Sequence, residues 1–453
     1  MRIVILGIGG TFMAGLATMA QSAGHQVIGF DNPLYPPMSD LLQNANIPVL
    51  PLDDPEQLWA SSPDLVLVGN VFSRGHPFIE ALMNSQIPFT SAPQWLASTL
   101  LKDKTVLAVT GTHGKTTTSS MLAWCLEKAG LNPGFLIGGI PENFGYSARL
   151  TDSPYFVIEA DEYDTAFFDK RPKFLHLFPK VLLVNPIEHD HVDIYPDLQS
   201  IERQFQLLLR NVPSEGALIA NPKTPASQRL VANNQLLPVE TIGPKGDWQY
   251  QSALKGWTAS KNGTDLTTID WSILGHHNKE NALMVMAACE KCGLTPEEVK
   301  PGLESFKSVK RRYEVVAQKA GTVFVDDFAH HPSAIEVTVE GLRDFYPEKS
   351  VVAIVDLGTR SMQQGAYQLE QWVSALDKAD KVFFHASREL NWSLSELIAK
   401  LPGECHVVSN DEQLLETLPS QLKGNEVVCM MSNTRFNQAL RSLAKAVSAE
   451  TVN

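Results

Sequence analysis

The sequence has few cysteines and a shortage of positive charge. Five cysteines in 453 residues give no disulfide framework, and Cys289 with Cys292 has no second pair with which to complete a zinc site. The formal net charge is −13, whereas proteins that bind nucleic acid or anionic membranes generally need a basic surface. We therefore expect no nucleic-acid partner, and any phosphate site must be local.

Long apolar runs are missing as well. No stretch approaches the ~20 apolar residues that a membrane-spanning helix requires. The N-terminal run MRIVILGIGG is interrupted by Gly7, Gly9 and Gly10 and lacks the small-residue cleavage pattern of a signal peptide, which favours a buried strand. These absences predict a cytoplasmic protein without a membrane partner.

Short apolar runs recur along the whole chain. They are RIVILG, QVIGFD, DLVLVG, TVLAVT, YFVIEA, KVLLVN, TVFVDD, SVVAIVD, KVFFH and EVVCMM. Strands buried on both faces have this composition, and the helical patterns between the runs favour parallel sheets with crossover helices. The sequence therefore predicts an α/β protein with mainly parallel sheets.

The runs fall into three expected domains. A second nucleotide-type strand and loop begins at Thr105. A new phosphate loop about 100 residues into a chain usually marks the start of a new domain. The basic connector SFKSVKRRYEVVAQ then precedes a third set of strands. We place the domains at residues 1–102, 103–311 and 312–453, the first and third Rossmann-like and the second of the P-loop type.

The stretch VTGTHGKTTT is typical of a phosphate-binding loop, although Val109 stands where a Walker A motif has its first glycine. Gly111 and Gly114 allow backbone N–H groups to approach phosphate oxygens, and the helix that follows adds its positive N-terminal end. Lys115 supplies a charge and Thr116 a hydroxyl for Mg²⁺. This shortened loop predicts a nucleotide phosphate site; a structural glycine turn is the alternative.

The N-terminal turn GIGGTFMAG is a weaker nucleotide signal. A dinucleotide fingerprint needs glycine at position 12, where Phe12 stands, so a nicotinamide site is not expected. Gly9, Gly10 and the following helix N-terminus can still hold a pyrophosphate, and Asp31 lies where a ribose-binding acid is expected. The alternative is a purely structural turn.

Carboxylates and histidines follow two consecutive strands in the second domain. The stretch VIEADEYD contributes Glu159, Asp161, Glu162 and Asp164, and PIEHDHVD contributes Glu188, His189, Asp190, His191 and Asp193. The carboxyl ends of parallel strands face the ligand crevice, and such oxygen-rich groups beside a phosphate loop favour a two-Mg²⁺ phosphoryl-transfer site. Zinc is disfavoured because no cysteine joins the histidines. A solvated acidic turn is the alternative.

Three later motifs carry further polar residues. GHHNKENA, KRRYEVV and VDDFAHHP contribute, in order, His277, Asn278 and Asn281; Arg311 and Arg312; and Asp326, Asp327, His330 and His331. The amides either cap a helix or face an adenine edge. Arginine near an interdomain connector is well suited to stabilising a transferring phosphoryl group, and a strand-end aspartate can accept a ribose hydroxyl.

The motifs TGTHGKTTT, EADEYD, NPIEHDHVD, GHHNKENA, RRYE and DDFAHHP, in this order, closely resemble those of the Mur ligases. The resemblance spans essentially the whole chain and implies an ATP-dependent amide-forming enzyme of peptidoglycan metabolism. It also implies a first domain for a UDP-sugar, a central ATPase domain with the shortened loop, and a third domain that brings the amine. A non-catalytic nucleotide sensor on the same fold is the alternative.

Within that family, LGIGGTFMAGLA, YPPMSDLL, GNVFSRGHP and LIGGIPENFGYSARL are most similar to a branch that recycles cell-wall peptide. The resemblance implies that UDP-N-acetylmuramate is joined to the tripeptide L-alanyl-γ-D-glutamyl-meso-diaminopimelate; addition of L-alanine alone is the alternative. Many family members carry a carbamylated lysine after the second-metal histidine, but no lysine occurs between Lys180 and Lys223, which is typical of the muramate-accepting branch.

The resemblance also assigns roles by motif, with ATP and Mg²⁺ as cofactors. Lys115, Glu159, His191 and Arg312 would be catalytic, and Thr116, Glu159 and His191 would bind Mg²⁺. The ATP-binding residues would be Gly111, Thr112, His113, Gly114, Lys115, Thr116, Thr117, His277, Asn278, Asn281, Arg312 and Asp327. The UDP-sugar would contact Gly9, Gly10, Thr11, Phe12, Asp31, Asn70 and Arg74, and the peptide would contact His330, His331, Arg360 and Ser432. The sequence predicts no oligomeric state.

Overall fold

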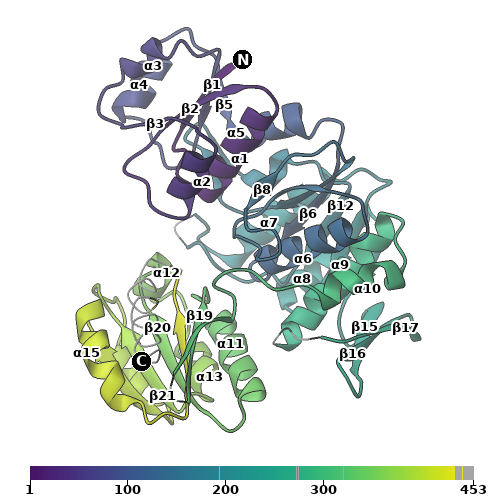
Figure 1. Cartoon of the computed structure of the whole chain (residues 1–453), viewed down its shortest axis with the longest axis vertical. Helices are drawn as coiled ribbons and strands as arrows, with labels where there is room; N and C mark the ends of the chain where they lie inside the picture. Colours follow the sequence, from purple (N-terminus) through teal and green to yellow (C-terminus); the bar gives the residue numbers. More distant parts are fainter. Residues whose placement is uncertain (193, 272, 274, 320, 434–440, 442–453) are drawn as a thin grey trace, which may run out of the picture. The chain divides into compact units, whose positions relative to one another are not determined.

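The computed structural model describes the chain except for residues 193, 272, 274, 320, 434–440 and 442–453 (Figure 1). It contains three large sheets, each mainly parallel and flanked by helices, so the predicted α/β class is confirmed. The chain divides into two compact units. Residues 1–189, 197–272 and 280–308 form the first unit, and residues 190–196, 273–279 and 309–453 form the second.

The N-terminal sheet has five strands in the order β3-β2-β1-β4-β5, and every neighbouring pair is parallel. Its strands are β1 (Arg2–Leu6), β2 (Gln26–Phe30), β3 (Val49–Leu50), β4 (Leu65–Val68) and β5 (Phe89–Ser91). Its helices are α1 (Thr11–Ser22), α2 (Met38–Asn44), α3 (Gln57–Ala60), α4 (Pro77–Met83), α5 (Ala92–Trp95) and the π-helical turn η1 (Leu96–Leu100). The strand order reverses between β1 and β4, and open α/β sheets generally bind ligands beyond the carboxyl ends of the strands at such a point.

The central sheet has seven strands in the order β14-β13-β12-β6-β9-β7-β8, and only β7 and β8 pair in antiparallel fashion. The strands are β6 (Thr105–Thr110), β7 (Gly134–Leu136), β8 (Ala148–Arg149), β9 (Tyr155–Glu159), β12 (Val181–Val184), β13 (Ala217–Ala220) and β14 (Val239–Thr241). Because β9 and β12 flank β6, the segments after these three strands meet at one edge of the sheet.

Helices α6 (Lys115–Lys128), α7 (Leu198–Leu209), α8 (Pro225–Ala232), α9 (His276–Lys291) and α10 (Pro296–Glu304) accompany this sheet. Helices α6 and α10 pack closely, since a side chain at Gly302 would lie 2.7 Å from the Cα atom of Cys125 (Figure 1). Two small antiparallel additions were not predicted. One is the hairpin β10 (Asp164–Ala166) and β11 (Asp169–Pro172), followed by the 3₁₀ turn η2 (Lys173–His176); the other is the sheet β15 (Trp248–Ser252), β16 (Trp257–Lys261) and β17 (Thr264–Ile269).

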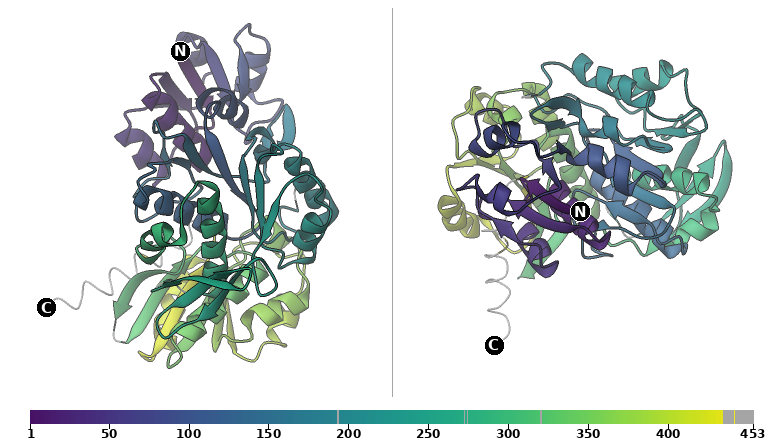
Figure 2. Two further views of the ribbon diagram at one scale, coloured as in Figure 1. Left: turned by 90° about the vertical axis from the view of Figure 1, so that its right-hand side faces the viewer. Right: turned by 90° about the horizontal axis from the view of Figure 1, so that it is seen from above.

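The sheet of the second unit is drawn in green to yellow in Figure 2. It has six strands in the order β18-β19-β23-β20-β21-β22, with β18 antiparallel and the others parallel. The strands are β18 (Glu314–Lys319), β19 (Thr322–Asp327), β20 (Ser350–Asp356), β21 (Lys381–His385), β22 (Glu404–Val408) and β23 (Glu426–Met431). Its helices are α11 (Pro332–Phe345), α12 (Arg360–Gln363), α13 (Leu369–Leu376), α14 (Leu394–Ile398) and α15 (Asp411–Gln421). Separate apolar cores cover its two faces, as expected for doubly buried strands.

Among the helices that the structure describes, none has the length and apolar character needed to cross a bilayer.

Candidate active site

The phosphate loop between β6 and α6 has a shape that only glycine permits at two positions. Gly111 and Gly114 have φ angles of +114° and +81°. A side chain on Gly111 would lie 2.6 Å from the carbonyl oxygen of Asn185, and one on Gly114 would lie 2.8 Å from its amide nitrogen and 3.1 Å from Asn281 Oδ1. The loop therefore rests directly on Asn185, which is fully buried, and lies beside Asn281.

Lys115, the first residue of α6, points back into the loop. Its ammonium donates to the carbonyl oxygen of Gly111 at 2.8 Å and to Glu162 Oε2 at 2.9 Å. Burial by itself lowers the pKa of Lys115, but the charges of Glu162, Asp161 and Glu159 outweigh it and raise the pKa above its usual value. Lys115 is therefore a permanent cation beneath the loop, and the buried Glu162 is its ion-pair partner.

Thr116 and Glu159 form the second polar pair of the loop. The Thr116 hydroxyl donates to Glu159 Oε1 at 2.9 Å, and the backbone N–H of Gly138 donates to Glu159 Oε2 at 2.7 Å. Burial and then the negative charge of Asp161 raise the pKa of Glu159 to about 7, although Lys115 opposes the shift. A carboxylate destabilised in this way, beside a hydroxyl, is a suitable oxygen ligand for Mg²⁺.

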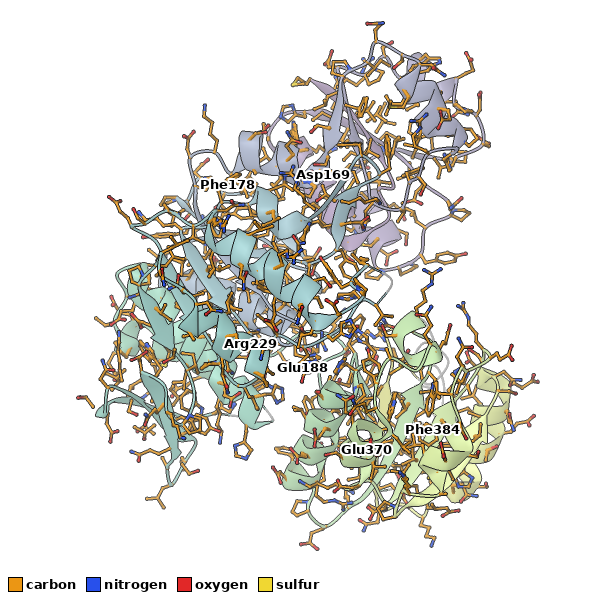
Figure 3. All side chains as sticks on the ribbon, turned by 180° about the vertical axis from the view of Figure 1, so that it is seen from behind. Asp169, Phe178, Glu188, Arg229, Glu370 and Phe384 are labelled. Carbon is orange, nitrogen blue, oxygen red and sulfur yellow. The ribbon has the colours of Figure 1, made fainter. Side chains whose placement is uncertain are left out.

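Residues after β12 anchor the loop from the other side. The backbone N–H of Thr112 donates to the carbonyl oxygen of Pro186 at 2.9 Å, and the backbone N–H of Glu188 donates to the Thr112 hydroxyl at 2.8 Å. His113 Nε2 lies 2.7 Å from Glu188 Oε2, and Figure 3 labels Glu188. Thr117 is buried within the first turns of α6. The segment after β12 therefore fixes the loop through both backbone and side-chain contacts.

The N-terminal turn between β1 and α1 also contains a glycine in a left-handed conformation. Gly7 has a φ angle of +81°, and the backbone N–H of Gly9 donates to Asp31 Oδ2 at 2.6 Å. Gly10 is the N-cap of α1, and Thr11 and Phe12 belong to its first turn, whose N–H groups have no acceptor within the helix. The predicted turn residues and Asp31 are therefore brought together.

The other two predicted UDP-sugar residues follow β4. Asn70 lies two residues beyond the end of that strand and is half-buried, at the point where the strand order reverses. Arg74 pairs with Glu80 at 2.9 Å, and 63% of its side chain is exposed. The role of both residues in sugar binding stays a prediction.

In the second unit, His191 stands in an uncommon backbone conformation. Its φ angle is +56°, a region that non-glycine residues rarely occupy outside functional sites and turns. Its neighbour Asp190 is buried, and Tyr367 donates to Asp190 Oδ1 at 3.4 Å. Burial alone raises the pKa of Asp190, but His191, His330 and nearby His331 hold it well below its usual range. The predicted metal residue therefore belongs to a buried cluster of histidines around a carboxylate.

The remaining predicted ATP residues of the second unit lie near its connector. The His277 ring stacks on Tyr313 with centroids 6.1 Å apart, and Asn278 is buried. The guanidinium of Arg312 lies 5.0 Å from the ring centre of Phe328. Asp327, at the end of β19, accepts the backbone N–H groups of Tyr313 and Ala329. Asp327 therefore fixes the connector, and its predicted contact with ribose stays a prediction.

The predicted peptide residues occupy two places in the second unit. His331 caps α11 by accepting the N–H of Ser333 at 3.2 Å, and burial lowers the pKa of His330 to about 4. Ser432 follows β23, is fully buried, and donates to Asp356 Oδ2 at 2.6 Å. Arg360 is exposed at the start of α12. These residues lie around the carboxyl ends of β19, β20 and β23.

Two residues that shape the loop were missed from the sequence. Asn185 supports the phosphate loop from below, and Gly138 holds Glu159 through its backbone N–H. Both lie just beyond the carboxyl ends of parallel strands, β12 and β7. Glu159 was predicted because it lies at the carboxyl end of a parallel strand, and this rule also applies to Asn185 and Gly138. Neither residue carries a charge, so the sequence alone did not single them out.

Comparison with known families gives the class to which this fold and site belong. The model for the Mur ligase family, catalytic domain, matches residues 2–104, that for the Mur ligase middle domain matches residues 109–289, and that for the Mur ligase, glutamate ligase domain, matches residues 311–434. The chain belongs to the Mur ligase family, whose members are ATP-dependent ligases.

Individual relatives point to one branch of the family. The chain is 40% identical to a UDP-N-acetylmuramate–L-alanyl-gamma-D-glutamyl-meso-2,6-diaminoheptandioate ligase of Haemophilus influenzae, over 96% of each chain. It is similar to the crystal structure of a murein peptide ligase from Psychrobacter arcticus 273-4, with 34% identity, a TM-score of 0.75, and coverage of 99% of this chain and 98% of that one. A UDP-N-acetylmuramate–L-alanine ligase of Desulfitobacterium hafniense is 29% identical over 94% of this chain and 96% of its own.

Proposed function

We propose that the protein is an ATP-dependent ligase that joins UDP-N-acetylmuramate to L-alanyl-γ-D-glutamyl-meso-diaminopimelate, the compound that the relative's name calls a diaminoheptandioate, in peptidoglycan recycling. The observation that carries the proposal is the ion pair of Lys115 with the buried Glu162, beside the hydrogen-bonded Thr116 and Glu159, in a chain 40% identical to such a ligase. We place the reaction in the cytoplasm, where ATP is available.

The proposed chemistry activates a carboxylate. The lactoyl carboxylate of UDP-N-acetylmuramate attacks the γ-phosphorus of ATP and releases ADP, which leaves an acyl phosphate. The free amine of the tripeptide attacks the acyl carbon, and phosphate departs as the amide forms. Since hydroxide is a far poorer leaving group than phosphate, this order makes an amide accessible in water. The protein's part is mainly to position the reactants and to neutralise charge.

The residues of the loop supply that neutralisation. The Lys115 ammonium, already charged and fixed by Gly111, is proposed to move from Glu162 to the β- and γ-phosphates. The loop N–H groups and the N-terminus of α6 take the remaining oxygens. Arg312 is proposed to stabilise the transferring phosphoryl group, and Asn278 and Asn281 with His277 to meet the adenine.

The donor atoms of this site fit Mg²⁺. Thr116 and Glu159 offer a hydroxyl and a carboxylate 2.9 Å apart, and hard oxygen donors of this kind prefer Mg²⁺ to softer metals. We propose that these two residues hold one ion and that His191 contributes to a second. When bound, the ions would neutralise phosphate charge. A bound Mg²⁺ would favour the ionised form of Glu159 and so lower its raised pKa.

The test is an amine panel. Purified protein receives ATP, Mg²⁺ and UDP-N-acetylmuramate, and either the free tripeptide or L-alanine, while phosphate release and product mass are followed. We expect release and the mass of the tripeptide adduct with the tripeptide alone. Release with L-alanine alone would contradict the proposal and move the protein to the alanine-adding branch. No release with either amine would refute the proposed acceptor, and ATP binding without turnover would favour the sensor.

A further inference from the structure

Three basic residues follow one another around β11, and two of them are neutralised. Lys170 pairs with Asp164 at 2.6 Å, and Arg171 pairs with Asp169 at 2.7 Å. Their side chains are 65% and 62% exposed. Lys173 differs from both, because it is half-buried and, within the part of the chain that the structure describes, forms no ion pair with a carboxylate.

Aromatic rings surround the Lys173 ammonium instead. Its Nζ atom lies 5.5 Å from the ring centre of Phe12 and 5.7 Å from that of Tyr163. Cation–π contacts at these distances stabilise the charge without using the N–H groups of the ammonium. Phe12 belongs to the first turn of α1. Lys173 therefore brings an ammonium with available donors next to the N-terminus of that helix.

The position of Lys173 is fixed by its backbone. Its N–H donates to the carbonyl oxygen of Tyr163 at 2.9 Å, and the next N–H, that of Phe174, donates to the carbonyl oxygen of Asp161 at 3.3 Å. These bonds tie Lys173 to the acidic segment that also supplies Glu162 to the phosphate loop. Backbone hydrogen bonds therefore hold Lys173 against the segment that follows β9 of the central sheet.

The hairpin that precedes Lys173 also contacts the N-terminal sheet. Phe89 of β5 stacks on Phe167 with ring centres 6.5 Å apart and meets Phe168 edge-on at 5.4 Å. Figure 3 labels Asp169, the first residue of β11, in this segment. This aromatic contact packs the hairpin against β5 of the N-terminal sheet.

The β1–α1 turn lacks a cation of its own. Its residues Gly7 to Phe12 include no basic side chain, and Asp31 presents a carboxylate to it through Gly9. A helix N-terminus carries only about half a positive charge, which does not balance a diphosphate. A diphosphate at this turn therefore needs a further positive group, and Lys173 is the lysine that lies beside it.

We propose that the ammonium of Lys173 binds the diphosphate of the sugar nucleotide, completing from the central sheet's edge a site whose other donors come from the β1–α1 turn. The choice of sugar nucleotide rests on the proposed function, whereas the contact itself requires only a uridine diphosphate group. Lys173 is a substrate-binding residue in this account, so it affects acceptor binding and leaves ATP binding unchanged.

Calorimetric titration of the full-length protein tests the proposal, with UDP and UDP-N-acetylmuramate as separate probes. We expect Lys173→Met to weaken both ligands by about tenfold or more, because a charge-assisted contact is lost. Lys173→Arg should bind nearly as well as the unchanged protein. Lys170→Met is the matched control, since it removes a neighbouring lysine that is exposed and already paired, and its affinities should not change. Affinity for ATP should be the same in all four proteins.

The outcomes separate this inference from the proposed function. Unchanged affinity of Lys173→Met for UDP would overturn the inference, as would a loss confined to UDP-N-acetylmuramate, which would place the ammonium at the sugar end. If the unchanged protein binds UDP but not UDP-N-acetylmuramate, the proposed function fails while the UDP titrations still decide the role of Lys173. Should Lys173→Met fold poorly by thermal denaturation, Lys173→Gln serves the same comparison.

Discussion

The β1–α1 turn and the β6–α6 loop share a backbone plan and differ in charge. Both connect a central parallel strand to a helix, and both contain glycine in a left-handed conformation. The β6–α6 loop carries Lys115, opposed by Glu162 and Glu159, whereas the β1–α1 turn meets a single carboxylate, Asp31. On the proposed function, the same geometry serves two tasks, holding a phosphate at the β1–α1 turn and reacting at one in the β6–α6 loop.

The difference shows what reaction requires beyond binding. Backbone N–H groups at a helix N-terminus offer hydrogen bonds to phosphate in either turn, but they carry only about half a positive charge. Transfer of a phosphoryl group also requires full charges that are positioned in advance, and these are expensive to bury unless each is paired. The central loop contains such pairs. The N-terminal turn has none and, on our inference, borrows Lys173 from a neighbouring segment.

The largest expected effect comes from removing the charge of the central loop. Lys115→Ala should lower kcat/KM for ATP by at least about 10³-fold, on the order of 4 kcal/mol, because Lys115 is proposed to neutralise charge that develops in the reaction. Phosphate release with the tripeptide present is the measurement. Lys128→Ala, at the other end of α6, is the control and should retain activity. Activity of Lys115→Ala within tenfold of the unchanged protein would refute the catalytic assignment.

A smaller effect is expected from disturbing the backbone that holds Glu159. A side chain on Gly138 would lie 2.9 Å from both carboxylate oxygens of Glu159, so Gly138→Ala must displace that carboxylate. We expect a fall of about 10- to 100-fold in kcat/KM and a higher Mg²⁺ requirement, as is typical when support for a metal ligand is lost. Titration of activity with Mg²⁺ is the measurement. An unchanged Mg²⁺ requirement would mean that Glu159 does not bind the ion.

Replacing Glu159 and replacing Asp31 by their amides should change the thermal stability of the protein in opposite directions. Folding raises the pKa of Glu159 from 4.5 to about 7, so its protonated form stabilises the folded protein at low pH and this contribution is lost as the pH rises toward 7. A glutamine can still accept the N–H of Gly138 and donate its own N–H to the Thr116 hydroxyl. Without Mg²⁺ or ATP, Glu159→Gln should therefore raise the Tm by about 2 °C at pH 8 and by less at pH 5. The thermal unfolding midpoint at the two pH values is the measurement.

Asp31→Asn is the matched variant in the N-terminal turn. Asp31 accepts N–H groups from both Gly9 and Asn32, one on each oxygen, and asparagine keeps only one acceptor. Its Tm should therefore fall by about 2 °C. Equal signs for the two variants would contradict the view that the central loop is destabilised by its charges and the N-terminal turn is not.

The smallest effect is expected at the edge of the N-terminal sheet. Arg74 and Glu80 form an exposed pair, so Arg74→Ala should leave the Tm nearly unchanged. If Arg74 contacts the sugar nucleotide as predicted, its loss raises the KM for UDP-N-acetylmuramate by about threefold or more. Glu80→Gln releases Arg74 from its partner and should not raise that KM. An unchanged KM in Arg74→Ala would remove this residue from the predicted site.

Much of the central site followed from sequence because two local rules converge there. Glycines at fixed spacing followed by Lys115 and Thr116 specify a phosphate loop, and the strand-end rule places Glu159 beside it. The loop prediction depends on residues adjacent in the sequence, and the position of Glu159 depends on one pair of neighbouring strands. The structure brings Thr116 within hydrogen-bonding distance of Glu159, as the predicted shared metal site requires.

Other features depend on contacts that no local pattern encodes. Glu162 was one of four carboxylates in its stretch, and only packing decides that it, rather than Asp164, pairs with Lys115. Asp164 instead pairs with Lys170 within the hairpin. The hairpin itself and the sheet β15–β17 were missed because their strands are short, partly exposed and polar, unlike the apolar runs that mark doubly buried strands.

The ion pair between Lys115 and Glu162 has a consequence for inhibitors. On the proposed function, ATP enters the loop by exchange, because its phosphates must draw the ammonium of Lys115 away from the carboxylate of Glu162. Neutral mimics of adenosine leave that pair intact and gain nothing from the loop. Compounds that compete at this locus should therefore carry a dense anionic tail, or else a cation that captures Glu162 and leaves the lysine without its partner.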